Sequence, residues 1–274
     1  MNVRQLEPDA IIYNAAISAC EKGARWHEAL GIFFHMQVAR LEMDVISYNA
    51  AISACEKGAR WHEGFGLFSE MRLRRVEPNV ITYSAAISAC AKGARWFEAL
   101  NTFLEMRVHR LEVDVVAYSA AISACGQGAR WHEALGAFAD MNVRQLEPDA
   151  IIYNAAISAC EKGARWHEAL GIFFHMQVAR LEMDVISYNA AISACEKGAR
   201  WHEGFGLFSE MRLRRVEPNV ITYSAAISAC AKGARWFEAL NTFLEMRVHR
   251  LEVDVVAYSA AISACGQGAR WHEA

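Results

Sequence analysis

The chain lacks the marks of several common classes of protein. None of its apolar runs approaches the roughly 20 residues that span a membrane, and no CxxC or HxxxH spacing suggests a metal site. No Ser/His/Asp set, carboxylate pair or phosphate-binding loop stands out. A net charge of −3 counts mildly against a generic polyanion binder, which is usually basic. We therefore expect no membrane partner, no metal or cofactor, no small-molecule substrate and no enzymatic activity in this segment.

What the sequence does contain is a repeat. The stretch from Tyr13 to Trp26 returns in close variants every 35 residues, without insertion or deletion, which is the signature of a repeat array. The segment 10–254 holds seven complete repeats, which start at residues 10, 45, 80, 115, 150, 185 and 220. Residues 1–9 are the tail of a truncated repeat and residues 255–274 a partial eighth one. Residues 1–134 recur unchanged as residues 141–274, which indicates a recent duplication or a deliberately repeated sequence.

Both ends of the chain fall inside a repeat. The N-terminus has neither a basic-then-apolar signal segment nor an Arg/Ser-rich transit segment. We expect the chain to be a fragment of a longer protein, with targeting information and terminal domains missing.

Each repeat predicts two helices. In the first repeat the apolar residues recur with helical spacing over about residues 10–22, with Asp9 as a plausible N-cap and Gly23 at the end. A second apolar stripe, which includes Trp26 and Phe33, predicts a helix over about residues 25–38. The prolines stand two residues before a first helix, where they do not disturb it. We therefore predict an all-α fold, a right-handed α-solenoid of tandem helix–turn–helix repeats.

The cysteines and tryptophans are predicted to serve packing. The eight cysteines occupy the same place in each repeat, so neighbouring thiols are about one helix diameter, roughly 10 Å, apart. Bridged Cα atoms lie within about 7 Å, so we expect buried free thiols in a reducing compartment. The tryptophans belong to the apolar stripe of the second helix, which favours core packing over stacking on bases. Trp271 has little second helix around it, so we expect the C-terminal repeat to fray.

One side of the first helix is mostly polar in every repeat. Stacked repeats would align these sides into one continuous concave surface, which solenoids use for extended ligands. In the first repeat this polar stripe consists of Ile11, Asn14, Ser18, Glu21 and Lys22.

At this point the residues resemble a known family. The 35-residue length, the Tyr-Asn of Tyr13, the Cys-x-Lys-Gly of Cys20, the Glu-Ala-Leu of Glu28 and the Phe-x-x-Met of Phe33 are similar to the pentatricopeptide repeat, in its plain 35-residue (P-class) form. The Pro-Asp or Pro-Asn near the end of some repeats also resembles this family. The tetratricopeptide repeat differs in length and in its Trp-x-x-Leu-Gly start. The chain departs from the family in one turn, where the usual glycine is replaced by Arg40, Arg75, Arg110 and Gln145.

The resemblance implies binding of single-stranded RNA, one base per repeat. The fifth residue of a repeat then contacts the base edge together with the last residue, and the second residue packs against the base. The implied base-contacting pairs are Asn14 with Asp44, Asn49 with Asn79, Ser84 with Asp114, Ser119 with Asp149, Asn154 with Asp184, Asn189 with Asn219, and Ser224 with Asp254. The implied packing residues are Ile11, Ile46, Ile81, Val116, Ile151, Ile186 and Ile221.

The family's pairing rule relates Asn with Asp to uracil, Asn with Asn to cytosine with uracil tolerated, and Ser with Asp to guanine. Because the family binds RNA parallel to the protein, the implied site is 5′-UYGGUYG-3′. Ser259 lacks its partner because the chain ends.

A lysine near the end of the first helix corresponds to a phosphate contact in the family. Gln127 and Gln267 interrupt this series, and Glu21 and Glu56, which stand beside two of the lysines, weaken the argument for phosphate binding. The implied phosphate contacts are Lys22, Lys57, Lys92, Lys162, Lys197 and Lys232.

Plainer interpretations stand beside these. Asp44 and Asp114 would also serve as N-caps alone, and Asn14 and Ser84 could belong to a solvated face. The alternative function is a protein–protein scaffold whose groove holds an extended peptide or helix, and a third is a degenerate duplicate without a preferred ligand. The resemblance implies RNA processing, stability, editing or translation in a mitochondrion or chloroplast. Protein partners or a fused nuclease or deaminase domain would belong to the full-length chain.

Overall fold

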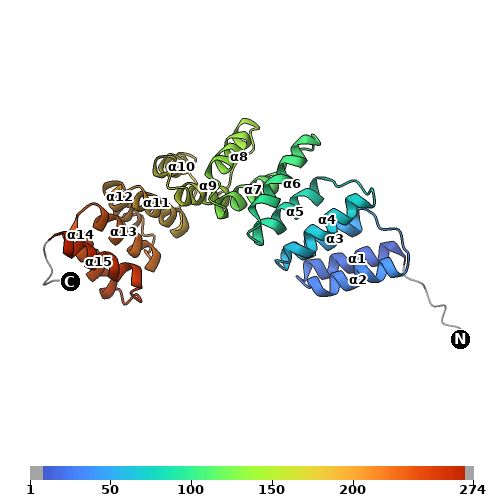
Figure 1. Cartoon of the computed structure of the whole chain (residues 1–274), viewed down its shortest axis with the longest axis horizontal. Coiled ribbons are helices and arrows are strands. Elements are labelled where there is room, and N and C mark those ends of the chain that lie inside the picture. The colour runs from blue at the N-terminus through green and yellow to red at the C-terminus, as the bar shows by residue number, and fades with distance from the viewer. Residues whose placement is uncertain (1–8, 269–274) are drawn as a thin grey trace. The chain divides into compact units, whose positions relative to one another are not determined.

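The computed structural model describes residues 9–268, and within them the chain forms fifteen α-helices and no strand (Figure 1). The fold is therefore all-α, as the sequence predicts. The first helices of the repeats are α1 (Ala10–Lys22), α3 (Val45–Lys57), α5 (Val80–Lys92), α7 (Val115–Gln127), α9 (Ala150–Lys162), α11 (Val185–Lys197), α13 (Val220–Lys232) and α15 (Val255–Gln267). The second helices are α2 (Trp26–Val38), α4 (Trp61–Leu73), α6 (Trp96–Val108), α8 (Trp131–Val143), α10 (Trp166–Val178), α12 (Trp201–Leu213) and α14 (Trp236–Val248).

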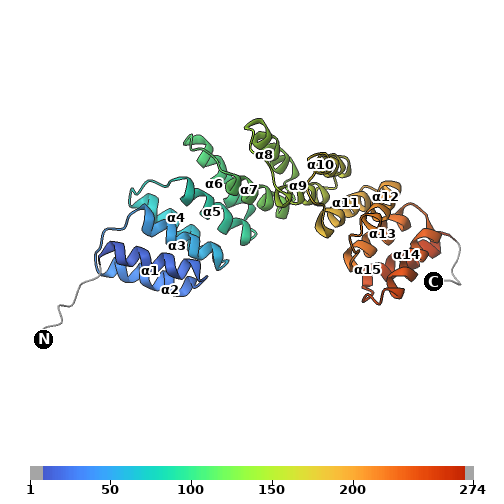
Figure 2. The same cartoon turned by 180° about the vertical axis from the view of Figure 1, so that it is seen from behind.

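The helices form two compact blocks, one ending at Gly128 and the other starting at Ala129. Within each block the first helices pack on the first helices of the adjacent repeats, and α1, α3, α5, α9, α11 and α13 also pack on their own second helices. Each second helix also packs on the next first helix, an order that both views of the ribbon show (Figure 2). Each block is thus a stretch of helical-repeat solenoid.

Small residues allow the first helices to stack closely. In α3, Ala51, Ala54 and Cys55 are fully buried, together with the larger Tyr48 and Ile52. Alanine on the facing sides brings helix axes near the lower end of the usual 8–10 Å separation, and an added methylene there would overpack the interface. The tyrosine, isoleucine and cysteine of α3 therefore lie in the interior.

Aromatic side chains join each second helix to the next repeat. Phe33 meets Tyr48 edge-on with ring centroids 5.2 Å apart, and Phe68 meets Tyr83 in the same way. Such pairs contribute about 0.5–1.5 kcal/mol beyond the area that they bury. The Tyr48 hydroxyl donates a hydrogen bond to Glu70 Oε1 at 3.3 Å. Burial, with the nearby Glu70 carboxylate, raises the pKa of Tyr48 to about 12.

The tryptophans pack between repeats, half-buried. A Cβ atom added at Gly58 would lie 2.4 Å from the Trp26 ring, so only glycine fits beneath this indole. The Arg60 guanidinium lies 4.5 Å from the centre of the same ring and pairs with Glu63. The predicted packing role of Trp26 is confirmed, whereas Trp271 and its expected fraying lie outside the described residues.

The two turns of each repeat use the left-handed region at residues other than glycine. Helix α1 ends before Gly23 as predicted, yet Gly23 has φ −82° and the following Ala24 has φ 53°. Gly23 therefore ends the helix as predicted, but the left-handed residue is the alanine after it, and at Gly58 the reason for glycine is the Trp26 ring. Between repeats, Arg40 has φ 54° and its neighbour Leu41 donates to Met36 O at 3.2 Å. Arginine thus takes the conformation that the family's glycine would take, at a cost of about 1 kcal/mol.

All eight cysteines are free thiols, as expected from the spacing of the repeats. Seven are buried and Cys20 is half-buried. Burial raises the pKa of the Cys55 and Cys90 thiols to about 12, so these thiols remain protonated and unreactive at neutral pH.

Candidate nucleic-acid interface

The predicted base-contacting residues meet as pairs. Asn14 Nδ2 donates to Asp44 Oδ1 at 3.3 Å, and Ser84 Oγ donates to Asp114 Oδ1 at 2.9 Å. Hydrogen bonds of the same kind join Asn49 to Asn79, Asn154 to Asp184, Asn189 to Asn219, and Ser224 to Asp254. In the remaining pair, Ser119 and Asp149 belong to different blocks, and their association stays a prediction.

The last residue of each pair is also the N-cap of the next first helix. Asp44 Oδ1 accepts the backbone N–H of Ser47 at 2.8 Å, and Asn79 Oδ1 accepts that of Thr82 at 3.1 Å. Capping and pairing therefore occur together, so a role of the last residue as N-cap does not exclude a role in contacting a base.

The cap also determines which side-chain atom of the last residue remains available to a ligand. Only an oxygen can accept the N–H of Thr82, so Asn79 must turn Oδ1 toward the helix and leave Nδ2 free as a donor. Asp44 uses Oδ1 for the cap and for Asn14, so its second carboxylate oxygen, Oδ2, takes part in neither of these contacts and can accept from a ligand. The two residue types thus present opposite hydrogen-bonding groups from the same position.

Asp44 is ionised under ordinary conditions. Burial opposes the charge, but the hydrogen bonds from Ser47 and Asn14 outweigh it and lower the pKa of Asp44 below its usual value. The same balance lowers the pKa of Asp184. The free oxygen of each is consequently a carboxylate oxygen, a strong acceptor for an N–H group.

A third residue, which was not predicted from the sequence, joins some pairs. The Ser47 hydroxyl donates to Asn14 Oδ1 at 2.7 Å, and the Thr82 hydroxyl donates to Asn49 Oδ1 at 2.5 Å. Ser47 and Thr82 are the third residues of α3 and α5, and both are fully buried. The sequence contains a signal for this contact, because a hydroxyl residue follows each asparagine repeat and none follows a serine repeat.

The predicted packing residues flank the pairs in a series of hollows. One hollow of about 530 Å³ is lined by Ile46, Asn49, Asn79 and Ile81, with Ser53 beside them. Ile46 and Ile81 are 60% and 59% exposed although they are large and apolar. The equivalent hollow of the other block, with Ile186, Asn189 and Ile221, has about 580 Å³. Each hollow therefore combines two exposed aliphatic side chains with one polar pair.

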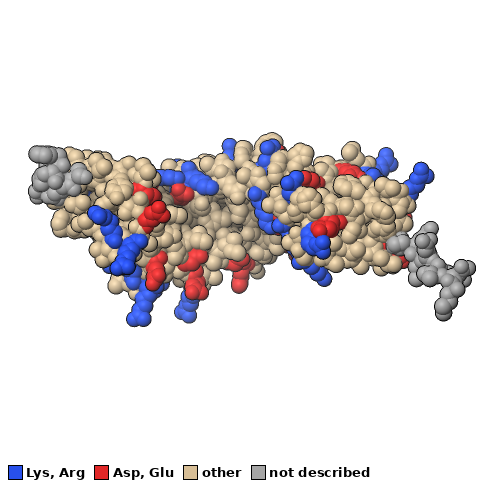
Figure 3. Space-filling model, turned by 90° about the horizontal axis from the view of Figure 1, so that it is seen from below, with Lys and Arg blue, Asp and Glu red and all other residues tan. Residues whose placement is uncertain are grey.

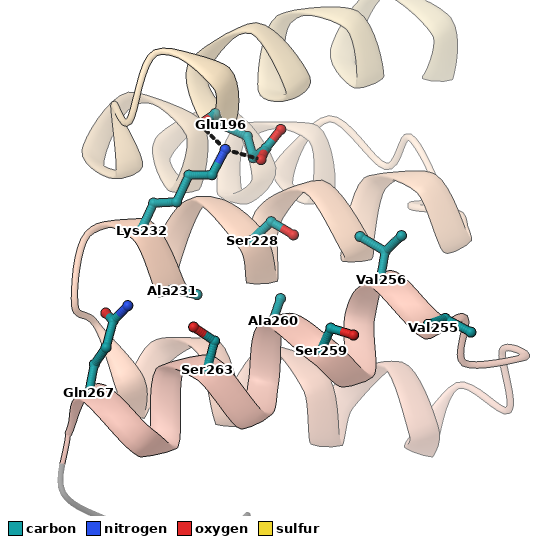
Figure 4. Close-up of a pocket in the computed structure, with 10 residues that line it drawn as sticks. All are labelled: Glu196, Ser228, Ala231, Lys232, Val255, Val256, Ser259, Ala260, Ser263 and Gln267. Atoms are coloured by element: carbon teal, nitrogen blue, oxygen red, sulfur yellow. Dashed lines mark hydrogen bonds and ion pairs between the residues drawn. The ribbon is translucent and has the colours of Figure 1, made fainter.

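A related hollow of about 410 Å³ lies between α13 and α15 (Figure 4). Val256 and Ser259 line it from α15, Ser228 lines it from α13, and Lys232 lies at its edge. Lys232 is turned away toward Glu196 of the preceding repeat, with Nζ 2.5 Å from the carboxylate. The amino group at the phosphate-contact position is therefore directed to Glu196.

Most of the predicted phosphate contacts are ion-paired. Lys57 lies 2.7 Å from Glu21, and Lys92 lies 2.5 Å from Glu56; Lys197 and Lys232 pair with Glu161 and Glu196 in the other block. Lys22 and Lys162 have no carboxylate partner among residues 9–268. The space-filling view also shows acidic and basic side chains side by side (Figure 3). The lysines are therefore largely neutralised in the free protein.

Other kinds of site are missing from the described residues. Within residues 9–268 no group of histidine, cysteine, aspartate and glutamate could hold a metal ion. None of the helices in the same range is long and apolar enough to cross a membrane.

Comparison with known families gives the class of the protein. The model of the pentatricopeptide repeat domain matches residues 1–58 and 101–163, that of the PPR repeat family matches residues 43–92 and 183–232, and that of the PPR repeat matches residues 81–111, 151–181 and 221–251. Together these matches cover almost the whole chain. The chain belongs to the pentatricopeptide repeat family, as the sequence predicts.

Solved structures agree with this fold. The pentatricopeptide repeat protein PPR10 from maize is 24% identical, with a TM-score of 0.61 over 93% of this chain and 36% of its own. PPR10 in complex with an 18-nt psaJ RNA element is 21% identical, with a TM-score of 0.60 over 98% of this chain and 44% of its own. The PPR domain of Arabidopsis thaliana protein-only RNase P 1, in complex with tRNA, is 14% identical, with a TM-score of 0.56 over 69% of this chain and 95% of its own. The chain thus spans less than half the length of PPR10, and no curated protein sequence matches it.

Proposed function

We propose that the chain binds single-stranded RNA in a sequence-specific manner, one base per repeat, at a site 5′-UYGGUYG-3′. The observation that carries the proposal is the hollow between adjacent repeats, where two exposed aliphatic side chains flank a hydrogen-bonded polar pair. Such a hollow fits a planar base with one polar edge. The structural similarity to PPR10 and to a PPR domain that were solved with RNA supports the same interpretation.

The last residue of a repeat would select the group at the Watson–Crick edge. Uracil presents N3–H and guanine presents N1–H, both donors, which match the free Oδ2 of Asp44 or Asp114. Cytosine presents N3 as an acceptor, which matches the free Nδ2 of Asn79. Ionisation of Asp44 strengthens the first kind of contact, and a hydrogen bond to a charged group contributes about 1.5–3 kcal/mol.

The fifth residue would select the neighbouring group on the same base. Asn14 gives one N–H to Asp44 and keeps its second N–H for a pyrimidine O2. Ser84 gives its only proton to Asp114, so its oxygen keeps lone pairs that accept from guanine N2–H2. Serine is also shorter than asparagine, which leaves space for the larger purine.

The lysines would bind the phosphates only after their glutamate partners are displaced. Six free lysine–phosphate contacts on a single strand would give a log–log salt slope of roughly −4. Because four lysines are ion-paired, we expect a shallower slope and a larger share of the affinity from the base-contacting pairs.

By analogy with the family, we propose that the setting is a mitochondrion or chloroplast, and that the chain contributes RNA recognition to processing, stability, editing or translation without catalysis of its own. Import of the full-length protein into one of these organelles would test the location.

Binding of short labelled RNAs at near-physiological salt tests the proposed function. The RNA UCGGUCG should bind at least tenfold more tightly than a scrambled RNA such as GUGCGCU. Equal binding of the two would reject sequence-specific recognition. Weak binding of both without salt dependence would favour the peptide-scaffold alternative.

Asp44→Asn tests the base assignment within the same molecule. The variant reproduces the pair that Asn49 forms with Asn79, so the first base should change from U to C, by about 10- to 100-fold in relative affinity. The fifth base, contacted by Asn154 and Asp184, should remain U and is the internal control. An unchanged preference for U at the first base would show that Asp44 is a helix cap only.

A further inference from the structure

A buried hydroxyl accompanies every asparagine at the fifth position of a repeat, and it comes from the following repeat. It belongs to the third residue of the next first helix, and these residues are Ser47, Thr82, Ser187 and Thr222. All four are fully buried. Where the fifth residue is a serine instead, the same position holds Ala117, Ile152 or Ala257. The hydroxyl is therefore present after repeats whose fifth residue carries an amide that has to be oriented, and absent after repeats whose fifth residue is serine.

The hydroxyl makes the shorter of the two hydrogen bonds that hold each amide. Ser187 Oγ lies 2.7 Å from Asn154 Oδ1, whereas Asn154 Nδ2 lies 3.3 Å from Asp184 Oδ1. The corresponding distances around Asn49 are 2.5 Å to Thr82 and 3.2 Å to Asn79. The amide is held from both ends, with the closer contact at its oxygen.

The single proton of the Ser187 hydroxyl belongs to Asn154. Asp184 Oδ1 lies 2.9 Å from the same hydroxyl, but it already accepts the backbone N–H of Ser187 and the Asn154 amide. If the proton went to Asp184, the hydroxyl lone pairs would face Asn154 Oδ1 at 2.7 Å in a buried site, which is unfavourable. Donation to Asn154 Oδ1 satisfies every group and keeps Nδ2 toward Asp184 and the hollow.

We propose that the third residue of each first helix is a positioning residue for the base bound by the preceding repeat: its hydroxyl, through Asn154 and its equivalents, prevents the amide from turning over. The inference rests on the proposed function, since it concerns the selectivity of the same site. Serine repeats need no such residue, because a hydroxyl has no second end that could be exchanged.

An amide that turns over would change the base that fits. With Oδ1 outward, Asn154 would accept from guanine N2–H2, while Asp184 would still accept N1–H. This orientation gives up the bond from Asn154 Nδ2 to Asp184 Oδ1 and places two oxygens face to face, so the Asp184 carboxylate and the Ser187 hydroxyl both oppose it. Loss of the hydroxyl should therefore raise the affinity for G relative to U at the fifth base, without a comparable change at other bases. A residue that only stabilises the helix would instead weaken binding of all RNAs alike.

Ser187→Ala is the direct test, with the duplicated repeat as its control. The preference for U over G at the fifth base should fall roughly 3- to 10-fold, the equivalent of one neutral hydrogen bond. The preference at the first base, where Ser47 is intact, should not change, and Ser187→Thr should retain the preference at the fifth. Helix α7 shows that the fold accepts alanine here, since Asp114 caps it through Ala117 N at 2.8 Å.

The reverse experiment introduces the contact between hydroxyl and amide in a repeat that has serine at the fifth position. Ser84→Asn alone should prefer U over G only weakly at the third base, because Asp114 alone holds the new amide, and Ser84→Asn with Ala117→Ser should prefer U roughly 3- to 10-fold more strongly. Equal selectivity of the single and double variants would overturn the proposal.

A measurement without RNA separates this inference from the proposed function. In NMR spectra of the free protein, the Asn154 side-chain amide signals should move toward random-coil positions in Ser187→Ala and stay in place in Ser187→Thr. Unmoved signals in Ser187→Ala would overturn the positioning role. If the signals move but the unaltered chain does not distinguish U from G, the hydroxyl orients the amide and it is the proposed RNA recognition that fails.

Discussion

The packing of tryptophan on glycine between repeats predicts opposite effects for two alanine substitutions. At Gly93 an added Cβ would lie 2.3 Å from two atoms of the Trp61 ring, where ordinary contact begins at 3.4 Å. The ring would have to retreat by about 1 Å, and overpacking of this size costs about 1–3 kcal/mol. Arg95, 4.6 Å from the same ring, would lose part of a cation–π contact of about 0.5–1 kcal/mol. Gly93 has φ −82°, so backbone strain does not contribute.

Gly66 is the matched control. It lies in α4, and a Cβ there would meet nothing within 4 Å. Because alanine is the better helix former, Gly66→Ala should stabilise the chain by about 0.5–1 kcal/mol. Urea unfolding followed by circular dichroism measures both variants: the midpoint should fall for Gly93→Ala and rise for Gly66→Ala. Shifts of the same sign and size would refute the conclusion that Trp61 packing depends on glycine.

Three further predictions concern the thiols, the lysines and the base-contacting residues. Burial raises the pKa of Cys55 to about 12 from an ordinary value of 9.0, so the folded state keeps this thiol protonated. Its contribution to stability is fully present below pH 9 and is lost as the pH rises toward 12, by about 1.4 kcal/mol for each pH unit above 9. Urea unfolding between pH 7 and 11 should show this decline, and a constant midpoint would contradict it. Glu56→Gln frees Lys92, so RNA affinity should rise at low salt and the log–log salt slope should steepen by about 0.7; an unchanged slope would show that Lys92 does not contact phosphate. Asn154→Ser should shift the fifth base from U toward G in RNA-selection experiments, and an unchanged preference would show that Asn154 is a surface residue only.

The local part of the structure could be predicted from the sequence. Helix α1 spans Ala10–Lys22 and is capped by Asp9, as the apolar spacing and the cap residue indicate. Helix α2 begins at Trp26, one residue after the predicted start. These features depend on contacts within one repeat, so the period of the sequence is enough to find them.

Contacts between repeats were harder to predict. The pairing of Lys92 with Glu56 joins residues 36 positions apart, and the contact of Ser47 with Asn14 joins residues 33 positions apart. Neither follows from a helical wheel, because both depend on how one repeat is rotated against the next. The requirement for glycine at Gly58 could not be predicted for the same reason: its neighbour Trp26 comes from the preceding repeat.

The double use of the last residue has a consequence for how such a chain can change. Aspartate and asparagine are about equally good at starting a helix, so exchanging Asp44 for asparagine alters the hydrogen bond offered to a ligand with little effect on folding. A change in one codon can then alter the base preferred by one repeat, while the other repeats keep their preferences. Because the altered chain still folds, each such change can be tolerated on its own. Duplication of whole repeats lengthens the array and provides additional repeats in which the last residue can be exchanged.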